Sequence, residues 1–223
     1  MPSPPARGLL IVVEGLDRSG KSSQCQRLQE NVVKAGHAAK YIKFPDRSTP
    51  TGQMINSYLT RQANQDDHSI HLLFAANRWE AVTSMLEDLK SGTTLVVDRY
   101  SFSGAVYSAA KDNPDLSLDW AWSPEIGLPK PDIVFFLDIS ASDAAKRGGY
   151  GDERYETEKL QSRVRTLFQQ LFSRLHGLSV YSVDAGASVD QVADIILSHF
   201  QEAAGSVDLA SAPQRLSGLG QIA

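Results

Sequence analysis

The sequence predicts an α/β fold in which a five-stranded parallel sheet has helices on both faces. Short apolar runs rich in β-branched residues, such as LLIVV at 9–13 and TLVVD at 94–98, are typical of strands buried on both faces. They alternate with longer segments whose apolar side chains recur at helical spacing, and this alternation favours parallel strands joined by helices. A chain of 223 residues, 42% of them hydrophobic, can bury the core that such a sheet needs.

The elements are expected to alternate along the chain. Strands are expected at 9–13, 37–44, 94–98, 132–138 and 178–183. Helices are expected at 21–35, 51–60, 67–90, 103–111, 158–175 and 189–200. Gly36 follows the first helix, Pro45 ends the second strand, and Gly92 follows the long third helix. Four prolines predict an irregular segment between the helix at 103–111 and the strand at 132–138.

We expect a single domain at 8–203, because no internal repeat or linker divides the chain. Residues 1–7 are expected to be a disordered tail, and 204–223 to be a C-terminal tail without an assigned role. Residues 141–157 are rich in glycine and charge and are expected to form a mobile lid segment.

The stretch GLDRSGKS, at 15–22, fits the phosphate-binding pattern G-x-x-x-x-G-K-[ST]. It lies between the first strand and the first helix, as the motif requires, although a glycine-rich turn is the simpler alternative. Gly15 and Gly20 allow the backbone to curl, so that amide N–H groups at a helix N-terminus can hold phosphate oxygens. Lys21 would bridge the outer phosphates and Ser22 would ligate Mg²⁺. The sequence therefore predicts a P-loop NTPase fold.

Polar motifs follow the first four strands, and the carboxyl ends of parallel strands meet at one edge of the sheet. Asp98, at the end of the third strand, is placed to hold Mg²⁺ as an acid of Walker B type; a turn cap is the alternative. Cations gather near this edge in a chain of net charge -4, namely Arg18, Lys21, Arg47, Arg78, Arg99, Arg147 and Arg154. A kinase that joins two phosphorylated substrates needs cations on both sides of the transferred group. The pattern favours a nucleoside monophosphate kinase.

Four separated motifs resemble the thymidylate kinase family: GLDRSGKSS at 15–23, FPDRS at 44–48, HLLFAANRWE at 71–80 and DRYSFSGAVYS at 98–108. The resemblance runs from about Gly8 to about Gln201. It is strongest with the eukaryotic-type branch, which carries an extra catalytic arginine inside the phosphate loop, here Arg18. It implies transfer of the γ-phosphate of ATP to dTMP with Mg²⁺, which gives dTDP and ADP for dTTP synthesis. It also implies a homodimer.

The resemblance implies a role for each matching residue. The catalytic residues implied are Arg18, Lys21 and Asp98, and Mg²⁺ would be held by Ser22 and Asp98. The ATP-binding residues implied are Arg18, Ser19, Gly20, Lys21, Ser22, Ser23 and Arg147. The dTMP-binding residues implied are Asp17, Phe44, Arg47, Phe74, Arg78, Arg99, Ser103, Gly104, Tyr107 and Tyr155.

Particular contacts follow from the same resemblance. Asp17 would accept a hydrogen bond from the 3'-hydroxyl, and Tyr107 would obstruct a 2'-hydroxyl. Arg147 would lie against the adenine. Phe74 would stack on thymine while Arg78 donates to the edge of the base, and their i, i+4 spacing places both on one helix face. Core packing is the alternative for Phe74.

Three other functions stay open. Another P-loop kinase, acting on a nucleoside or a different monophosphate, is the nearest, although a nucleoside kinase has no use for two arginines awaiting an acceptor phosphate. A GTPase switch would carry N-K-x-D, and D-x-x-G after the third strand, and neither occurs. A non-catalytic binding protein would be expected to lose Lys21, Ser22 or Asp98, and all are present.

Composition limits the partners. An acidic balance argues against nucleic acid, and no apolar stretch approaches the roughly 20 residues that span a membrane. Cys25 is the single cysteine and cannot form an internal disulfide, which fits a reducing compartment. We therefore expect the protein in the cytoplasm, with the nucleus as an additional open location.

Overall fold

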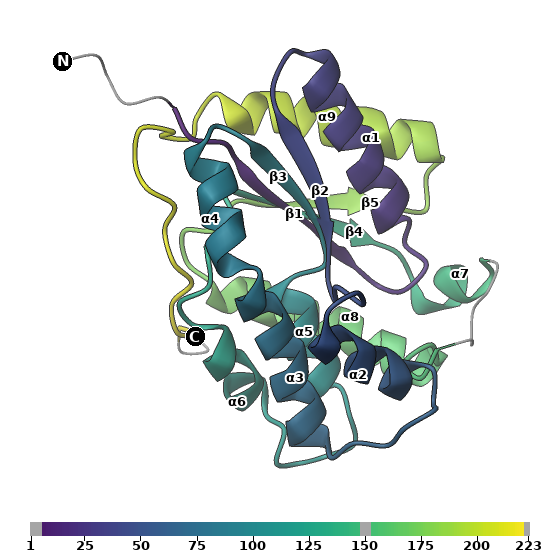
Figure 1. Cartoon of the computed structure of the whole chain (residues 1–223). Helices are drawn as coiled ribbons and strands as arrows, with labels where there is room; N and C mark the ends of the chain where they lie inside the picture. The colour runs from purple at the N-terminus through teal and green to yellow at the C-terminus, as the bar shows by residue number, and fades with distance from the viewer. Residues whose placement is uncertain (1–5, 148–152, 221–223) are drawn as a thin grey trace.

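The computed structural model describes residues 6–147 and 153–220, and within them five strands form one parallel sheet in the order β2-β3-β1-β4-β5 (Figure 1). The strands are β1 Leu10–Gly15, β2 Ala39–Lys43, β3 Thr94–Asp98, β4 Ile133–Asp138 and β5 Val180–Asp184. Each lies within two residues of its predicted place. The predicted fold class is therefore confirmed.

The helices are α1 Lys21–Lys34, α2 Pro50–Leu59, α3 Asp67–Glu80, α4 Val82–Lys90, α5 Ser101–Ala109, α6 Leu118–Trp122, α7 Ala141–Ala145, α8 Glu158–Arg174 and α9 Val189–Ala204, with a 3₁₀ helix η1 at Ser123–Glu125. Helices α1 and α9 cover one face of the sheet, and α4, α5 and α8 cover the other (Figure 1). Both faces of the central strands β1, β3 and β4 are thus shielded from water, which explains their apolar runs, whereas the edge strands β2 and β5 are partly exposed.

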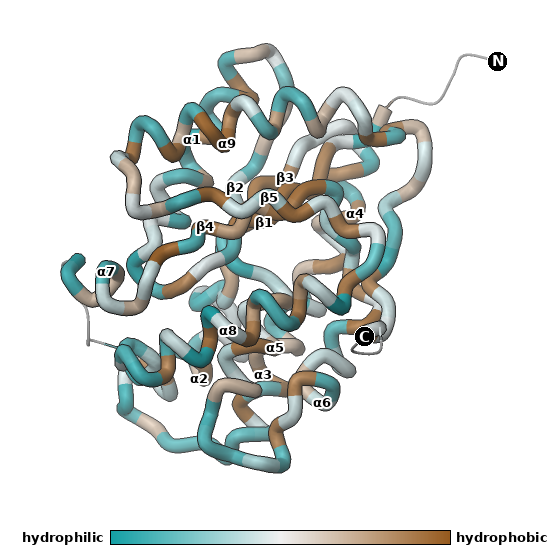
Figure 2. The backbone as a smooth tube through the Cα atoms, turned by 180° about the vertical axis from the view of Figure 1, so that it is seen from behind, coloured by the Kyte–Doolittle hydropathy of each residue, from teal (hydrophilic) through white to brown (hydrophobic). Residues whose placement is uncertain are grey.

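The sheet provides a rigid base for the residues that follow its strands. Leu10, Ile11, Val12 and Val13 of β1 have no exposed surface. Figure 2 shows the sheet as a hydrophobic layer between the two sets of helices. Because β1 lies between β3 and β4, with Val13 opposite Asp98 and Gly15 opposite Leu137, the ends of these strands are fixed next to one another. No helix within the described residues is both long and apolar enough to cross a membrane.

Two predicted segments differ from the structure. The helix expected at 67–90 is interrupted at Ala81, because α3 packs against α2 and α5 whereas α4 packs against β3. The segment expected to be irregular contains α6, whose first turn is capped by the Ser117 hydroxyl, and η1. Of the four prolines, only Pro124 lies in one of these helices, in the first turn of η1, where a proline is well tolerated, whereas Pro129 forms an isolated β-bridge with Arg215.

The chain ends pack more closely on the domain than the sequence predicted. Residues 1–5 of the expected disordered tail lie outside the described residues, but Arg7 is 9% exposed and its guanidinium forms two 2.7 Å hydrogen bonds to the Asp132 carboxylate. At the other end, Leu216 is 5% exposed and packs against the main core. The C-terminal segment crosses the side of the molecule and passes α6 (Figure 1).

Candidate active site

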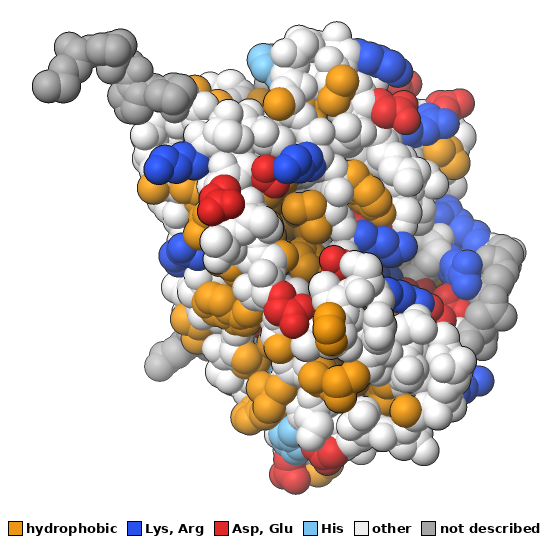
Figure 3. All heavy atoms as spheres, in the orientation of Figure 1, with side chains coloured by type: hydrophobic (Ala, Val, Ile, Leu, Met, Phe, Trp, Pro, Cys, Tyr) orange, Lys and Arg blue, Asp and Glu red, His pale blue; other side chains and the backbone are white. Residues whose placement is uncertain are grey.

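A cleft of about 410 Å³ opens where β1, β2 and β3 end. Lys and Arg side chains gather around this hollow (Figure 3). The predicted site residues that line it are Asp17, Arg18, Gly20, Lys21, Ser22, Ser23, Phe44, Arg47, Phe74, Arg78, Asp98, Arg99, Ser103, Gly104, Tyr107, Arg147 and Tyr155. Ser19 was also predicted, but it does not line the cleft: it is 3% exposed and its hydroxyl accepts a hydrogen bond from Lys21.

The phosphate loop curls through unusual backbone conformations. Arg18 and Gly20 have φ angles of 62° and 94°, in the left-handed region. Gly15 has φ 147°, and a Cβ there would lie 2.6 Å from the Leu137 carbonyl oxygen, so a side chain is excluded by contact as well as by conformation. The curl carries the chain directly into α1, which leaves the free amide groups of the helix N-terminus at the cleft.

Lys21 is held beneath this loop. It is 6% exposed, and its ammonium group donates to the Leu16 carbonyl oxygen and, at 3.3 Å, to the Ser19 hydroxyl. Burial and the nearby charge of Arg99 together lower the pKa of Lys21 to about 8, against the opposing effect of Asp17. A bound polyanion would favour the charged form of this ammonium group.

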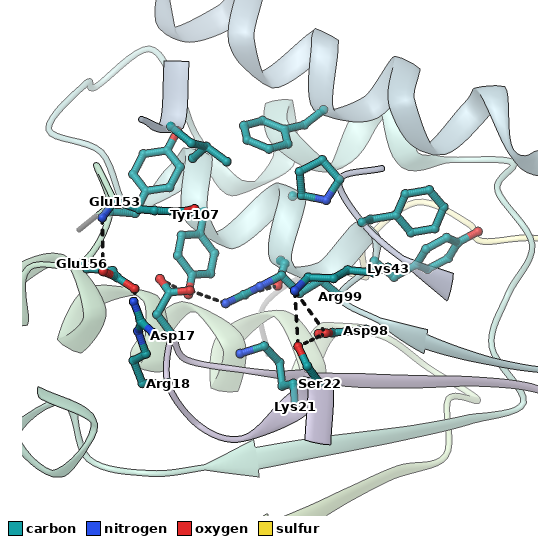
Figure 4. Close-up of a pocket in the computed structure, with 18 of the residues that line it drawn as sticks. Asp17, Arg18, Lys21, Ser22, Lys43, Asp98, Arg99, Tyr107, Glu153 and Glu156 are labelled. Atoms are coloured by element: carbon teal, nitrogen blue, oxygen red, sulfur yellow. Dashed lines mark hydrogen bonds and ion pairs between the residues drawn. The ribbon is translucent and has the colours of Figure 1, made fainter. Parts of the chain in front are cut away.

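Ser22 and Asp98 meet at the base of the cleft (Figure 4). The Ser22 hydroxyl donates to Asp98 Oδ2 at 2.5 Å, and the Tyr41 hydroxyl donates to the same oxygen at 3.0 Å. Asp98 is 1% exposed, and its Oδ1 atom has no hydrogen-bond partner among the described residues. A buried carboxylate oxygen without a donor, next to a hydroxyl oxygen, suits a hard cation such as Mg²⁺.

A second network surrounds Asp17 and faces the cleft (Figure 4). Asp17 accepts hydrogen bonds from Arg99, from Gln161 Nε2 at 2.6 Å and from the Tyr107 hydroxyl at 3.1 Å. Burial acts to raise the pKa of Asp17, but the charges of Arg99 and Lys21 hold it below its usual range. Asp17 is therefore an ionised acceptor. Gln161, on α8, was not predicted as a site residue.

Glu14 is a further residue that the sequence prediction missed. It has no exposed surface and accepts hydrogen bonds from the Tyr100 amide at 2.8 Å, the Ser103 amide at 3.0 Å and the Ser103 hydroxyl at 2.5 Å. Burial raises the pKa of Glu14, although Ser103 and Arg99 oppose that shift. By holding the first turn of α5, Glu14 fixes the direction of Arg99, whose φ is 65°. The sequence feature that could have revealed Glu14 is an acidic residue at the end of an otherwise apolar strand, because a buried acid needs hydrogen-bond partners.

The far end of the cleft is aromatic. Phe74 and Arg78 lie one turn apart on α3, and both face the cleft as their spacing predicted. Phe74 also packs against a small cluster of buried residues that includes Ile55 and Tyr58, so the core-packing alternative is correct for part of its surface. Phe44 packs on Tyr100 with ring centroids 5.9 Å apart. This end of the cleft suits a flat ring.

Residues 153–156 lie over the cleft, whereas 148–152 of the predicted lid lie outside the described residues. Arg47 Nη2 lies 2.7 Å from a carboxylate oxygen of Glu153. Arg18 Nε lies 2.9 Å from a carboxylate oxygen of Glu156 (Figure 4). The Tyr155 ring lies 5.7 Å from that of Tyr107. Two predicted phosphate-binding arginines are thus joined to carboxylates of the lid.

Arg147 and Arg154 lie within the predicted lid segment. Arg147 follows α7 and donates to the Arg18 carbonyl oxygen at 2.8 Å and to the Ala185 carbonyl oxygen at 2.5 Å. Arg154 donates to the Tyr58 carbonyl oxygen at 3.0 Å, and its guanidinium carbon lies 4.2 Å from the centre of the Tyr58 ring. Arg154 therefore attaches the lid to α2 and does not line the cleft.

Comparison with known proteins agrees with this geometry. The family described as Thymidylate kinase matches residues 13–196. A human thymidylate kinase is 50% identical over 186 residues, which cover 83% of this chain and 86% of that protein. One from Arabidopsis thaliana is 55% identical over 165 residues, 74% of this chain and 62% of that protein. A solved structure of the Candida albicans thymidylate kinase has a TM-score of 0.81 and 35% identity, and the match covers 96% of this chain and 100% of that one. This chain belongs to the thymidylate kinase family.

Proposed function

We propose that this protein transfers the γ-phosphate of ATP to dTMP and releases dTDP and ADP, a step of dTTP synthesis. The observation that carries the proposal is a cleft with a phosphate loop at one end, an aromatic end that suits a base, and arginines between them. Membership of the thymidylate kinase family supports it over a nucleoside kinase, a GTPase switch or a non-catalytic protein.

The donor half would be formed by the phosphate loop and α1. The backbone amides of Gly20, Lys21 and Ser22 would hold the β-phosphate, and the Lys21 ammonium would reach the outer phosphates. Ser22 and Asp98 would hold Mg²⁺, which neutralises phosphate charge when it is bound. Arg18 would leave Glu156 and move onto the transferred group, while Arg147 would lie against the adenine.

The acceptor half would be formed by Arg47, Arg99 and Asp17. The two guanidinium groups would bind the dTMP phosphate, since planar forks of donors match phosphate oxygens well. The ionised Asp17 would accept a hydrogen bond from the 3'-hydroxyl. Tyr107, whose hydroxyl already contacts Asp17, would lie against the sugar where a 2'-hydroxyl would clash.

The base would lie between Phe74 and the opposite wall of the cleft. Phe74 would stack on thymine, Arg78 would donate to its edge, and Phe44, Ser103, Gly104 and Tyr155 would complete the pocket. No residue needs to act as a strong base, because the acceptor phosphate is already ionised near neutral pH. Catalysis would come from positioning and charge neutralisation.

The proposed function predicts a definite order of acceptors. With ATP and Mg²⁺, ADP release should depend on dTMP, proceed more slowly with dUMP, and fall almost to the background rate with UMP or thymidine. The thymine methyl contributes only about 1 kcal/mol, whereas the 2'-hydroxyl meets a steric clash and thymidine lacks the phosphate. A coupled assay with each acceptor alone, and one without acceptor, measures this order. Preference for thymidine, or equal turnover without acceptor, would contradict the proposal.

We also propose that the protein forms a homodimer and works in the cytoplasm, with the nucleus as an additional open location. Leu72, Trp79 and Ile126 are each more than two-fifths exposed and do not line the cleft, so they could form an apolar contact between copies. Light scattering at micromolar concentration should give twice the mass of the chain. A monomer would exclude the dimer, and a fluorescent fusion viewed in cells tests the compartments.

A further inference from the structure

Arg78 forms a buried ion pair that the proposed chemistry does not use. Its side chain is 3% exposed and that of Glu125 has no exposed surface. Arg78 Nε donates to Glu125 Oε2 at 2.8 Å, and Arg78 Nη2 donates to Oε1. A buried charge without a partner is strongly unfavourable, so each of these groups holds the other in place.

The pair also determines which donors of Arg78 stay available. Glu125 occupies the edge of the guanidinium that carries Nε and Nη2, and Nη1 donates no hydrogen bond within the described residues. Arg78 lines the cleft, and a Cβ on Gly104 would lie 2.8 Å from its Cζ and 3.0 Å from Nη1. The guanidinium is therefore confined between Glu125 and the backbone of α5, so its direction is fixed.

Glu125 is in turn held by the C-terminal segment. We call residues 214–217 the C-terminal strap. Leu216 exchanges main-chain hydrogen bonds of 2.9 Å with Gly127 and Leu128, which lie two and three residues after Glu125. Before Glu125, the Trp122 indole donates to the Ser217 carbonyl oxygen at 2.8 Å. The strap is thus joined to the chain on both sides of Glu125.

We propose that Glu125 is a positioning residue that aims Arg78 at the edge of the acceptor base, and that the C-terminal strap keeps Glu125 in place. This inference rests on the proposed function. A pyrimidine with a carbonyl oxygen at its 4-position accepts hydrogen bonds from the aimed guanidinium. A pyrimidine with an amino group at that position is rejected, because the amino group and the Arg78 guanidinium are both hydrogen-bond donors and neither can accept from the other.

Glu125→Gln tests the positioning role. Glutamine keeps the shape of the side chain but turns an N–H₂ group toward one guanidinium donor, which displaces Arg78. We expect the KM for dTMP to rise about tenfold, the preference for dTMP over dCMP to fall, and the KM for ATP to stay within about twofold. An unchanged KM for dTMP in the folded variant would overturn the proposal.

Asp132→Asn is the matched control, because Asp132 also accepts two hydrogen bonds from a largely buried arginine, Arg7, but lies outside the cleft. Thermal unfolding of both variants reports the loss of a buried ion pair. A structural effect alone would raise the KM for dTMP equally in the two variants. The proposal requires the increase in Glu125→Gln only.

A double-mutant cycle separates this inference from the proposed function. Arg78→Ala should raise the KM for dTMP far more than that for ATP, and adding Glu125→Gln should cause little further increase, because Glu125 acts through Arg78. Failure of Arg78→Ala to affect dTMP would remove the base-reading role from the proposed function. A selective effect of Arg78→Ala that adds fully to that of Glu125→Gln would instead overturn the positioning role alone.

Two C-terminal deletions of different length test the role of the C-terminal strap. Removing 214–223 deletes the strap, whereas removing 218–223 keeps it and still loses the hydrogen bond from Arg174 to the Gly220 carbonyl oxygen. We expect a selective increase in the KM for dTMP from the first deletion only. If the shorter chain does not fold, Trp122→Phe, which removes one bond to the strap, should still raise this KM about threefold. Normal dTMP binding in Trp122→Phe and in the folded shorter chain would contradict the role of the strap.

Discussion

Lys21→Ala is expected to lower the turnover of dTMP about a thousandfold at saturating ATP. The Lys21 ammonium is the buried cation beneath the phosphate loop, and its loss leaves the developing charge on the outer phosphates without a fixed partner. The substitution removes a buried charge that already has a lowered pKa, so the melting temperature should change little. Steady-state kinetics and thermal unfolding of the same preparation check both expectations.

Lys34→Ala is the control for this experiment. Lys34 lies in the last turn of the same helix, and its side chain is 73% exposed. Its loss should leave turnover unchanged. Turnover of Lys21→Ala at the level of Lys34→Ala would contradict the assignment of the phosphate loop as the donor site.

Asp98→Asn is expected to lower turnover roughly a hundredfold and to raise the Mg²⁺ concentration at half-maximal rate about tenfold. The asparagine keeps a carbonyl oxygen but loses the charge that attracts a cation, and its amide donors oppose one. A titration of activity with Mg²⁺ at fixed ATP measures both changes.

Asp138→Asn provides the matched comparison, because Asp138 also ends a central strand but its carboxylate is bound by Arg165 at 2.6 and 2.8 Å. Its Mg²⁺ requirement should match that of the unmodified protein. If Asp98→Asn showed the same requirement, Asp98 would not hold the metal.

The sequence predicted the sheet, the phosphate loop and most of the residues that line the cleft, because these depend on local patterns. Strand burial appears as an apolar run, and the phosphate loop is one continuous motif. The i, i+4 spacing of Phe74 and Arg78 likewise places them on one face of α3. Local patterns of this kind can be recognised in the sequence without knowledge of the tertiary structure.

The residues that were missed act through contacts distant in sequence. Glu125 lies 47 positions from Arg78, and Gln161 lies 144 positions from Asp17, so no local spacing relates them. The break at Ala81 also depends on the different partners of α3 and α4. Ser19 illustrates a different limit of motif reading: the motif position marks it as an ATP-binding residue, but its side chain is buried and its hydroxyl accepts a hydrogen bond from Lys21.

The contacts of Arg47 with Glu153 and of Arg18 with Glu156 have a consequence for selectivity among anions. If Arg47 and Arg18 bind phosphate as proposed, an entering phosphate group would replace a carboxylate that already contacts the arginine, so binding would be an exchange of one anion for another. A small free anion such as inorganic phosphate gains only the difference between two similar ion pairs. A nucleotide would add the contacts of its sugar and base and complete the exchange, so the protein would distinguish nucleotides from simple inorganic phosphates.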